Sequence, residues 1–305
     1  MATQSAPITL KFPSYITAIT ERARDSASPD MEYLHWVALS LKKEPTTYTI
    51  TKIVDRLSFT GGGVKRVYRA TMHLAALDVT ASVVLKIAIG RRYARDLKKE
   101  AQVYMKKLTS LLGCRVPFCY GVWSGETYDG QTAVMVLQDA GDPLRRAIAQ
   151  QPVLFRQRIL KHLLAVHRAG VSFGQFGEDN VVVCNTEGEL YPTLIGFGNA
   201  DTSHKCPYAG DIAVYSRMPE DPLPCPELWD VALMAEAYHP CTVDYFGEKV
   251  SLDNVRSSED VVKIGKRPDG IPEDVALAYA ERVVGEFIDW RKARLEMDKQ
   301  PVRLR

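Results

Sequence analysis

The sequence lacks the features that mark secreted or membrane-spanning chains. No apolar run reaches the roughly 18 residues that a membrane-crossing helix needs, so we expect no such helix. The first residues do not combine a basic segment with a long apolar one, so we expect no secretion signal. The six cysteines are scattered, without the density of a disulfide framework. We therefore predict reduced thiols in a cytoplasmic protein, with a nuclear protein as the alternative.

A dominant charge of one sign is also absent. The 39 basic and 37 acidic residues give a net charge of +2, which is too small to favour nucleic acid or an acidic membrane surface. Hydrophobic residues make up 46% of the 305 residues and charged residues 25%, which is typical of a chain that buries a core. The length suits one large domain of two lobes or two ordinary domains. We expect a folded protein that binds neither nucleic acid nor a membrane.

The apolar pattern changes its period along the chain. Between residues 14 and 41 apolar residues recur at roughly helical spacing, which predicts a helical extension over residues 1–48. Strand-like segments rich in β-branched residues and segments of helical period follow. In chain order, the predicted strands span residues 48–59, 64–75, 79–89, 116–125 and 130–141, and the predicted helices span residues 91–113, 152–170, 225–238 and 272–297.

A glycine triplet, Gly61, Gly62 and Gly63, separates the first two of these predicted strands. Backbone N–H groups in a glycine turn can surround a phosphate because no side chain projects into the space. A tight hairpin would explain the same three residues without any ligand. Both interpretations stay open at this point.

Lys86 lies within the apolar run "VVLKIAI", and Glu100 follows in the next predicted helix. An interior-facing lysine on a strand is costly to bury unless an acidic group pairs with it. The separation of fourteen positions suits a strand end, a short turn and half a helix. We predict an ion pair between Lys86 and Glu100, and two solvated surface charges are the alternative.

The order of these elements resembles the protein-kinase fold from residue 49 to about residue 200. The loops "GVSFGQFGEDNVVV" and "PTLIGFGNA", with "TSHKCP" after them, are most similar to kinase-like proteins that are abundant in fungi. The resemblance implies an α+β, two-lobed fold. An antiparallel-sheet N-lobe would span residues 49–141, and a shortened, mainly helical C-lobe would span residues 142–305.

The resemblance also implies which residues would bind a nucleotide. In the family a glycine loop, a strand lysine with its helix glutamate, a hinge segment and a loop asparagine surround ATP. Here the matching residues are Gly61, Gly62, Gly63, Lys86, Glu100, Gln138 in the hinge-like segment 136–141, and Asn180.

Two positions depart from the family pattern. Gln175 stands where an aspartate accepts the proton of the substrate hydroxyl, and an amide has no basic lone pair for that role. Gly196 stands where an aspartate binds magnesium, an ion that prefers carboxylate oxygens. Glu178 and Asp179 could replace the missing carboxylates, as could Asp201, because catalysis depends on where a charge lies in space.

The chain is therefore interpreted as a degenerate member of the protein-kinase-like superfamily, a pseudokinase. We expect a regulatory module that binds an unidentified protein partner, binds ATP weakly and holds neither Mg²⁺ nor another metal. One alternative is an atypical phosphotransferase, or another nucleotide-dependent transferase, that uses Glu178 or Asp179 on a small molecule or a protein. A second alternative is a structural or host-interaction protein whose cleft is filled by Phe173 and Phe176.

Histidines and cysteines late in the chain raise a further alternative, a zinc site. His204 and Cys206 are separated by one residue, as are His239 and Cys241, and Cys225 lies between the two pairs. The spacing matches none of the tight Cys-x-x-Cys knuckles of zinc sites. We therefore expect ordinary loop histidines and buried thiols at these positions.

Overall fold

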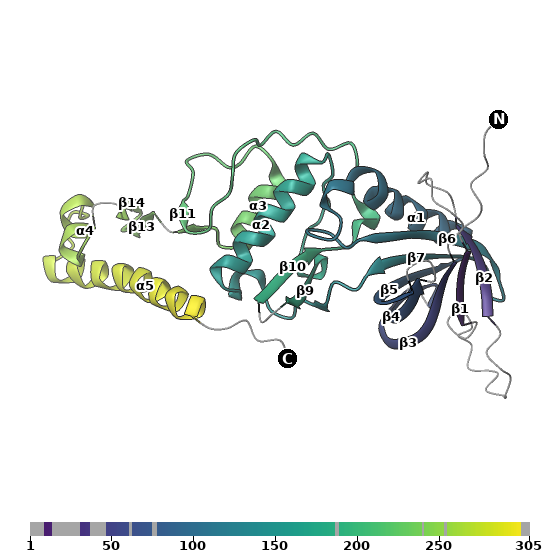
Figure 1. Cartoon of the computed structure of the whole chain (residues 1–305). Helices are drawn as coiled ribbons and strands as arrows, with labels where there is room; N and C mark the ends of the chain where they lie inside the picture. Colours follow the sequence, from purple (N-terminus) through teal and green to yellow (C-terminus); the bar gives the residue numbers. More distant parts are fainter. Residues whose placement is uncertain are drawn as a thin grey trace.

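Strands predominate at the start of the chain and helices are added further along, which confirms the α+β class (Figure 1). The computed structural model describes residues 9–13, 31–36, 47–60, 63–74, 78–186, 189–239, 241–252 and 255–299.

Seven strands form a sheet that closes on itself in the order β1-β2-β6-β7-β5-β4-β3. Their bounds are Thr9–Pro13 (β1), Met31–Trp36 (β2), Thr47–Thr60 (β3), Lys65–Leu74 (β4), Val79–Ile89 (β5), Cys119–Thr127 (β6) and Gly130–Gln138 (β7). Neighbouring strands are antiparallel except β1 and β3, which run parallel. The five strands that the sequence predicts from residue 48 onward are confirmed, and two more precede them.

The predicted helical extension is wrong where the structure describes it. Thr9–Pro13 and Met31–Trp36 are strands, and β2 pairs with both β1 and β6. The apolar spacing spanned a break at "SASPD", so it joined positions that belong to different segments. The stretch "MEYLHW" also contains tyrosine and tryptophan, which favour strands when a neighbouring strand is present to pair with. The rest of the predicted extension lies outside the described residues.

Alternation along β5 separates an inner and an outer face of the sheet. Val83, Leu85 and Ile87 are buried inside, in one apolar cluster with Trp123 of β6. Lys86 falls between them and therefore lies on the outer face, because successive strand side chains point to opposite sides. That face is covered by the helix α1, Arg91–Gln102. A π-helical turn, Val103–Lys107, continues this helix.

The middle of the chain forms a helical layer with a small sheet beside it (Figure 1). Its elements are β8 (Asp142–Pro143), α2 (Val153–Arg168), β9 (Val181–Thr186), β10 (Glu189–Leu194), β11 (Ser216–Arg217), α3 (Pro226–Met234) and β12 (Tyr238–His239). Arg156 of α2 is fully buried and donates to Ala235 O at 2.9 Å and to Tyr215 Oη at 2.8 Å. Its guanidinium therefore connects α2 to Tyr215, which precedes α3 in the sequence, and to Ala235, which follows it.

The last part of the chain has an apolar cluster of its own. It contains β13 (Thr242–Tyr245), β14 (Glu248–Ser251), α4 (Ser258–Ile264) and α5 (Glu273–Lys299). The long helix α5 was predicted, whereas α4 and the β13–β14 hairpin were not. Tyr245, Val261 and Ala280 are buried in this cluster, so the part of α5 that contains Ala280 packs there. In Figure 1 this unit projects from the helical layer.

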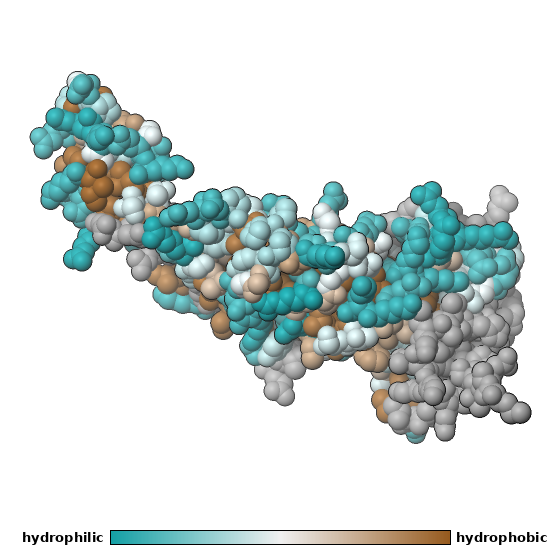
Figure 2. Space-filling view, turned by 90° about the horizontal axis from the view of Figure 1, so that it is seen from above, coloured by the Kyte–Doolittle hydropathy of each residue, from teal (hydrophilic) through white to brown (hydrophobic). Residues whose placement is uncertain are grey.

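Hydrophilic residues cover much of the face shown in Figure 2, with smaller apolar areas between them. Exposed large apolar side chains such as Tyr128, Leu154 and Leu295 occur on separate elements. Within the described ranges, no helix is both long enough and apolar enough to cross a membrane.

Candidate functional site

Lys86 and Glu100 form the ion pair that the sequence predicts. Lys86 Nζ lies 2.5 Å from Glu100 Oε1, across the gap between β5 and α1. The Glu100 side chain is 7% exposed and that of Lys86 26% exposed, so the carboxylate is the more deeply buried partner. A buried carboxylate requires a cation and hydrogen-bond donors nearby. The alternative of two solvated surface charges is therefore wrong.

A cavity of about 520 Å³ opens beside this ion pair, and we call it the Lys86 cavity. Its walls come from β4, β5, α1 and the loop that contains Gly196. The acidic residues in its lining are Asp96 and Glu100, whereas Lys65, Lys86 and Lys99 contribute positive charge. The lining therefore offers more cationic than anionic groups, which suits an anion better than a free metal ion.

The three glycines precede β4 in the sequence, but Gly61 and Gly62 are outside the described residues. Gly63 is described, and its φ of +95° is a left-handed conformation that favours glycine. Its carbonyl accepts from Arg66 Nε at 2.7 Å, and Arg66 also lies 3.4 Å from Asp129. Arg66 is 5% exposed, so this buried guanidinium stabilises the turn.

Asn180 and Gly196, sixteen positions apart in the sequence, lie side by side in the structure. Asn180 Nδ2 donates to Ile195 O at 3.1 Å, and Asn180 Oδ1 accepts from Gly177 N at 3.1 Å. Gly196 has a φ of +88°, and a Cβ atom there would lie 2.8 Å from Asn180 Nδ2. The amide of Asn180 therefore stands next to the space that any side chain at position 196 would enter.

The other polar residues of the loop lie in varied surroundings. Gln175 and Asp179 are exposed, whereas Glu178 is half-buried and accepts from Ile148 N at 3.3 Å. Asp201 accepts from Ser203 N at 2.8 Å and from Ser203 Oγ at 2.7 Å. These bonds hold the pKa of Asp201 below its usual range. Glu178 and Asp201 thus have local partners.

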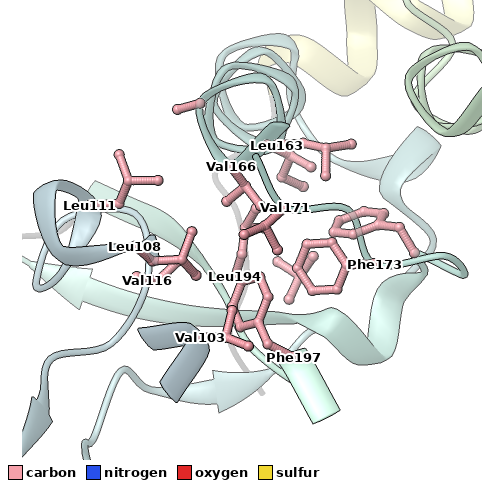
Figure 3. Packing of buried hydrophobic residues seen from close by; sticks show 14 of the residues in the cluster. Val103, Leu108, Leu111, Val116, Leu163, Val166, Val171, Phe173, Leu194 and Phe197 are labelled. Carbon is pink, nitrogen blue, oxygen red and sulfur yellow. The ribbon is translucent and has the colours of Figure 1, made fainter. Parts of the chain in front are cut away.

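Aromatic side chains pack behind the Lys86 cavity. The ring centroids of Phe173 and Phe197 lie 4.5 Å apart, and Phe176 packs against Phe173 at 5.1 Å. Tyr104, in the π-helical turn, meets Phe197 edge-on at 5.1 Å. Figure 3 shows Phe173 and Phe197 in the apolar cluster below α2. Phe173 and Phe176 are thus buried, as the filled-cleft alternative expects, but neither lines the Lys86 cavity, which stays open.

Burial of Tyr104 has an electrostatic consequence. Its side chain is fully buried, so desolvation raises the pKa of the phenol well above its usual range, and the nearby charge of Glu100 adds to the shift. The phenol therefore stays protonated at neutral pH, and its ring serves as a packing element between α1 and Phe197.

Arg69 of β4 bonds to residues of segment 138–142, which overlaps the hinge-like segment 136–141. Arg69 Nε lies 2.9 Å from Asp139 Oδ2, and Arg69 Nη2 donates to Gly141 O at 3.2 Å and to Asp142 Oδ1 at 3.0 Å. Gly141 N donates to Asp139 Oδ1 at 3.2 Å. Gln138 Oε1 accepts from Phe118 N at 3.2 Å. Backbone and side-chain groups of the segment are therefore already bonded within the protein.

Gly141 is also a point of close backbone approach. Its φ is +104°, and a Cβ atom there would lie 1.9 Å from Val183 O. Any other residue at this position would separate the segment from β9, because backbone atoms cannot move aside as a flexible side chain can.

Three of the five histidines and cysteines considered for a zinc site come together. His204, Cys206 and Cys225 lie with His167 in a group that we call the His–Cys cluster. His167, in the last turn of α2, was missed because it reads as part of an apolar helix face. Glu227 was missed as well, and its Oε2 lies 2.6 Å from His167 Nε2. Cys225 is buried, as expected of a thiol, and whether these residues bind a metal stays a question for experiment.

The second His-x-Cys pair lies elsewhere. His239 belongs to β12 and lines a cavity of about 370 Å³ with Trp290 of α5. Cys241 Sγ lies 3.6 Å from His239 O. Cys241 and His239 are not among the residues of the His–Cys cluster.

Comparisons with known proteins leave the family open. No protein-family model matches the chain, and no curated protein matches it either.

Proposed function

We propose that this protein is a pseudokinase: a kinase-like module that transfers no phosphate and regulates a partner protein by binding it. The ion pair of Lys86 and Glu100 supports the kinase-like part, as does the position of Asn180 beside Gly196. Each of these pairings joins residues to which the resemblance assigns related roles at a nucleotide site.

The observation that carries the proposal is the chemistry of positions 175 and 196. Gln175 is exposed and offers an amide in place of a proton acceptor. Gly196 offers no side chain, and Asn180 Nδ2, a donor, stands next to it. Mg²⁺ requires oxygen ligands, usually including a carboxylate. Phosphoryl transfer depends on both groups, so their loss favours a module without catalysis.

The bonds of segment 138–142 support weak nucleotide binding. A nucleotide base that approached this segment would compete with Arg69 for Gly141 O and with Asp139 for Gly141 N. Replacing such bonds contributes little net free energy, because each new hydrogen bond costs an existing one. The cationic lining of the Lys86 cavity would still attract the phosphates.

A thermal-shift titration with ATP, with and without Mg²⁺, tests the proposal. We expect about 1 mM ATP to raise the unfolding temperature by less than about 1 °C, with or without Mg²⁺. A rise of about 5 °C that requires Mg²⁺ would contradict the proposal, because it means that carboxylates hold the ion. Lys86→Met should abolish any small shift, whereas Lys161→Met, on the exposed face of α2, should leave it unchanged.

Measuring nucleotide turnover distinguishes the transferase alternative from the pseudokinase proposal. That function predicts nucleotide consumption that is lost in Asp179→Asn and in Lys86→Met, because Asp179 is the exposed acidic group of the loop. The pseudokinase proposal predicts that consumption by the unchanged protein equals that of both variants over a broad panel of acceptors.

A further inference from the structure

Four side chains that each offer a ligand atom converge at the end of α2. The ring nitrogens of His167 and His204 and the sulfurs of Cys206 and Cys225 all lie within 4.8 Å of one another. They come from the last turn of α2, from the loop after Phe197, and from the residue before α3. His167 and Cys225 are each 1% exposed, and the other two are half-buried.

The distances in the His–Cys cluster fit a tetrahedral ion. Cys225 Sγ lies 3.5 Å from His167 Nδ1 and 3.9 Å from His204 Nε2. For zinc, with Zn–S of about 2.3 Å and Zn–N of about 2.0–2.1 Å, tetrahedral geometry separates sulfur and nitrogen ligands by about 3.6 Å. These two sulfur–nitrogen separations therefore lie within a few tenths of an ångström of the value that the ion would impose, and the other separations are at most 4.8 Å.

Glu227 orients one of the histidines for this role. Glu227 Oε2 lies 2.6 Å from His167 Nε2 and accepts from Phe173 N at 3.0 Å. The Glu227 carboxylate accepts a hydrogen bond from Nε2–H, so the lone pair of the neutral ring is on Nδ1, which faces Cys225. Metal-binding histidines generally donate their second N–H to a carboxylate or carbonyl in this way.

We propose that His167, His204, Cys206 and Cys225 bind one Zn²⁺ ion. Two thiolates and two neutral imidazoles are a ligand set that zinc favours. On binding, the two thiols release their protons to solvent, and the thiolates neutralise the charge of the ion. This neutralisation removes the cost of an isolated charge at a mostly buried position. Four protein ligands leave no open coordination position, so the role of the ion is structural.

The ion would join parts of the molecule that are distant in the sequence. Through His167 the ion would be bound to α2, and through Cys225 to the start of α3. His204 and Cys206 would bind it to segment 201–225, which lies between these helices in the sequence. Glu227 extends the connection to the backbone of Phe173, at the start of the loop that contains Gln175. This inference does not depend on the proposed function, because none of the four ligands lines the Lys86 cavity.

Metal analysis of the intact, reduced protein tests the proposal. We expect about one zinc per chain after purification, and less than about one tenth of that in Cys225→Ser and in His204→Ala. Cys241→Ser provides a matched control, because Cys241 belongs to a His-x-Cys pair of the same spacing outside the cluster. This control should retain about one zinc per chain.

Cobalt spectroscopy on the unchanged protein keeps the test independent of how the variants fold. Metal-free protein, prepared with a chelator and a reductant, should bind Co²⁺ and develop the absorption of tetrahedral cobalt with sulfur-to-metal charge transfer. Removal of the zinc should lower the unfolding temperature by about 5 °C or more, and zinc should restore it.

Three results would overturn the proposal. One is purified, reduced protein that contains less than about one tenth of a zinc per chain and gives no cobalt absorption. Another is a metal content that stays unchanged in Cys225→Ser, because the ion would then be bound elsewhere. The third is a native disulfide between Cys206 and Cys225 in metal-free protein alkylated at isolation, since it would remove both thiolates.

Discussion

The Lys86 cavity and the His–Cys cluster differ in the ligand atoms that they offer. At the cavity, Lys86 and Glu100 are paired, but positions 175 and 196 contribute no carboxylate oxygen. At the cluster, imidazole nitrogens and thiol sulfurs converge although their sequence spacing fits no known zinc knuckle. The Lys86–Glu100 pair was thus predictable from the sequence, whereas the full set of ligands in the cluster follows no spacing rule.

The two regions also differ in how they compensate buried polar groups. In the cavity a full charge is matched by an opposite charge, at a cost in desolvation. In the cluster, polar contacts form a chain from Glu227 through His167 to Cys225. Burial raises the pKa of the Cys225 thiol and lowers that of the His204 imidazole, and both shifts favour neutral forms in the absence of an ion.

The largest effect is expected when the ion pair of the cavity is broken. Lys86→Met leaves the Glu100 carboxylate buried without its cation and should lower the free energy of unfolding by about 2–3 kcal/mol, after allowance for the partial exposure of Lys86. The double variant Lys86→Met/Glu100→Met should recover most of the loss, because it removes both charges. Urea denaturation measures both. A loss below about 0.5 kcal/mol would mean that solvent compensates Glu100.

A somewhat smaller effect concerns pH and comes from His162 of α2. Desolvation lowers the pKa of His162 to about 4, and the charge of Arg115 contributes. Because this folded-state pKa lies below the unfolded value of 6.5, the folded state binds the proton less readily. The contribution of His162 to the free energy of unfolding is therefore fully present above pH 6.5. It decreases as pH falls from 6.5 towards 4, and the loss is roughly 2 kcal/mol at pH 5.

Urea midpoints at pH 7.5 and pH 5, for the unchanged protein and for His162→Asn, check this prediction. The variant should lose most of the difference between the two pH values. An unchanged difference would assign the acid sensitivity to other groups, among them those of the His–Cys cluster.

Gly196→Ala should have a moderate effect. Its φ of +88° and the 2.8 Å approach of a Cβ to Asn180 Nδ2 both oppose a side chain, so we expect a loss of about 1–2 kcal/mol. Gly198→Ala is the matched control, since a Cβ there meets Glu100 Oε2 at an ordinary 3.5 Å. The control should change stability by less than about 0.5 kcal/mol in thermal or urea unfolding. Equal losses in both variants would show that position 196 is not special.

The smallest effect is expected for Gln175→Asp. The side chain is exposed, so its replacement should change stability by less than about 0.5 kcal/mol. Nucleotide consumption should also stay at background, because position 196 still provides no metal ligand. Appearance of Mg²⁺-dependent turnover would mean that the cavity differs from an active site by a single acid.

Much of the sheet and several helices could be predicted from local sequence. Alternation in "VTASVVLKIAI" predicts a strand with two faces, and the cost of burying Lys86 predicts its pairing with Glu100. These arguments succeed because they depend on neighbouring residues or on a single strand-to-helix connection. They fail for β2, since a short apolar stretch carries little information about whether a partner strand is available.

The His–Cys cluster could not be predicted for a related reason. Its ligands are separated by α2, the loop of Asn180 and a Pro-rich segment, so their meeting depends on how α2 and α3 pack. His167 alone is indistinguishable from any histidine on a buried helix face. A signal did exist in His204, Cys206 and Cys225, but no spacing rule connected them with His167.

The contact between Gly141 and Val183 affects how far the two halves of the molecule can move. In enzymes that bind a nucleotide between two lobes, a few residues of the connection absorb the rotation that admits substrate and releases product. Here a backbone-to-backbone fit and the Arg69 bonds hold the segment that follows β7, so rotation about it would have to break several interactions at once. Residues on either side of this segment should therefore keep a fixed orientation when a ligand or partner binds.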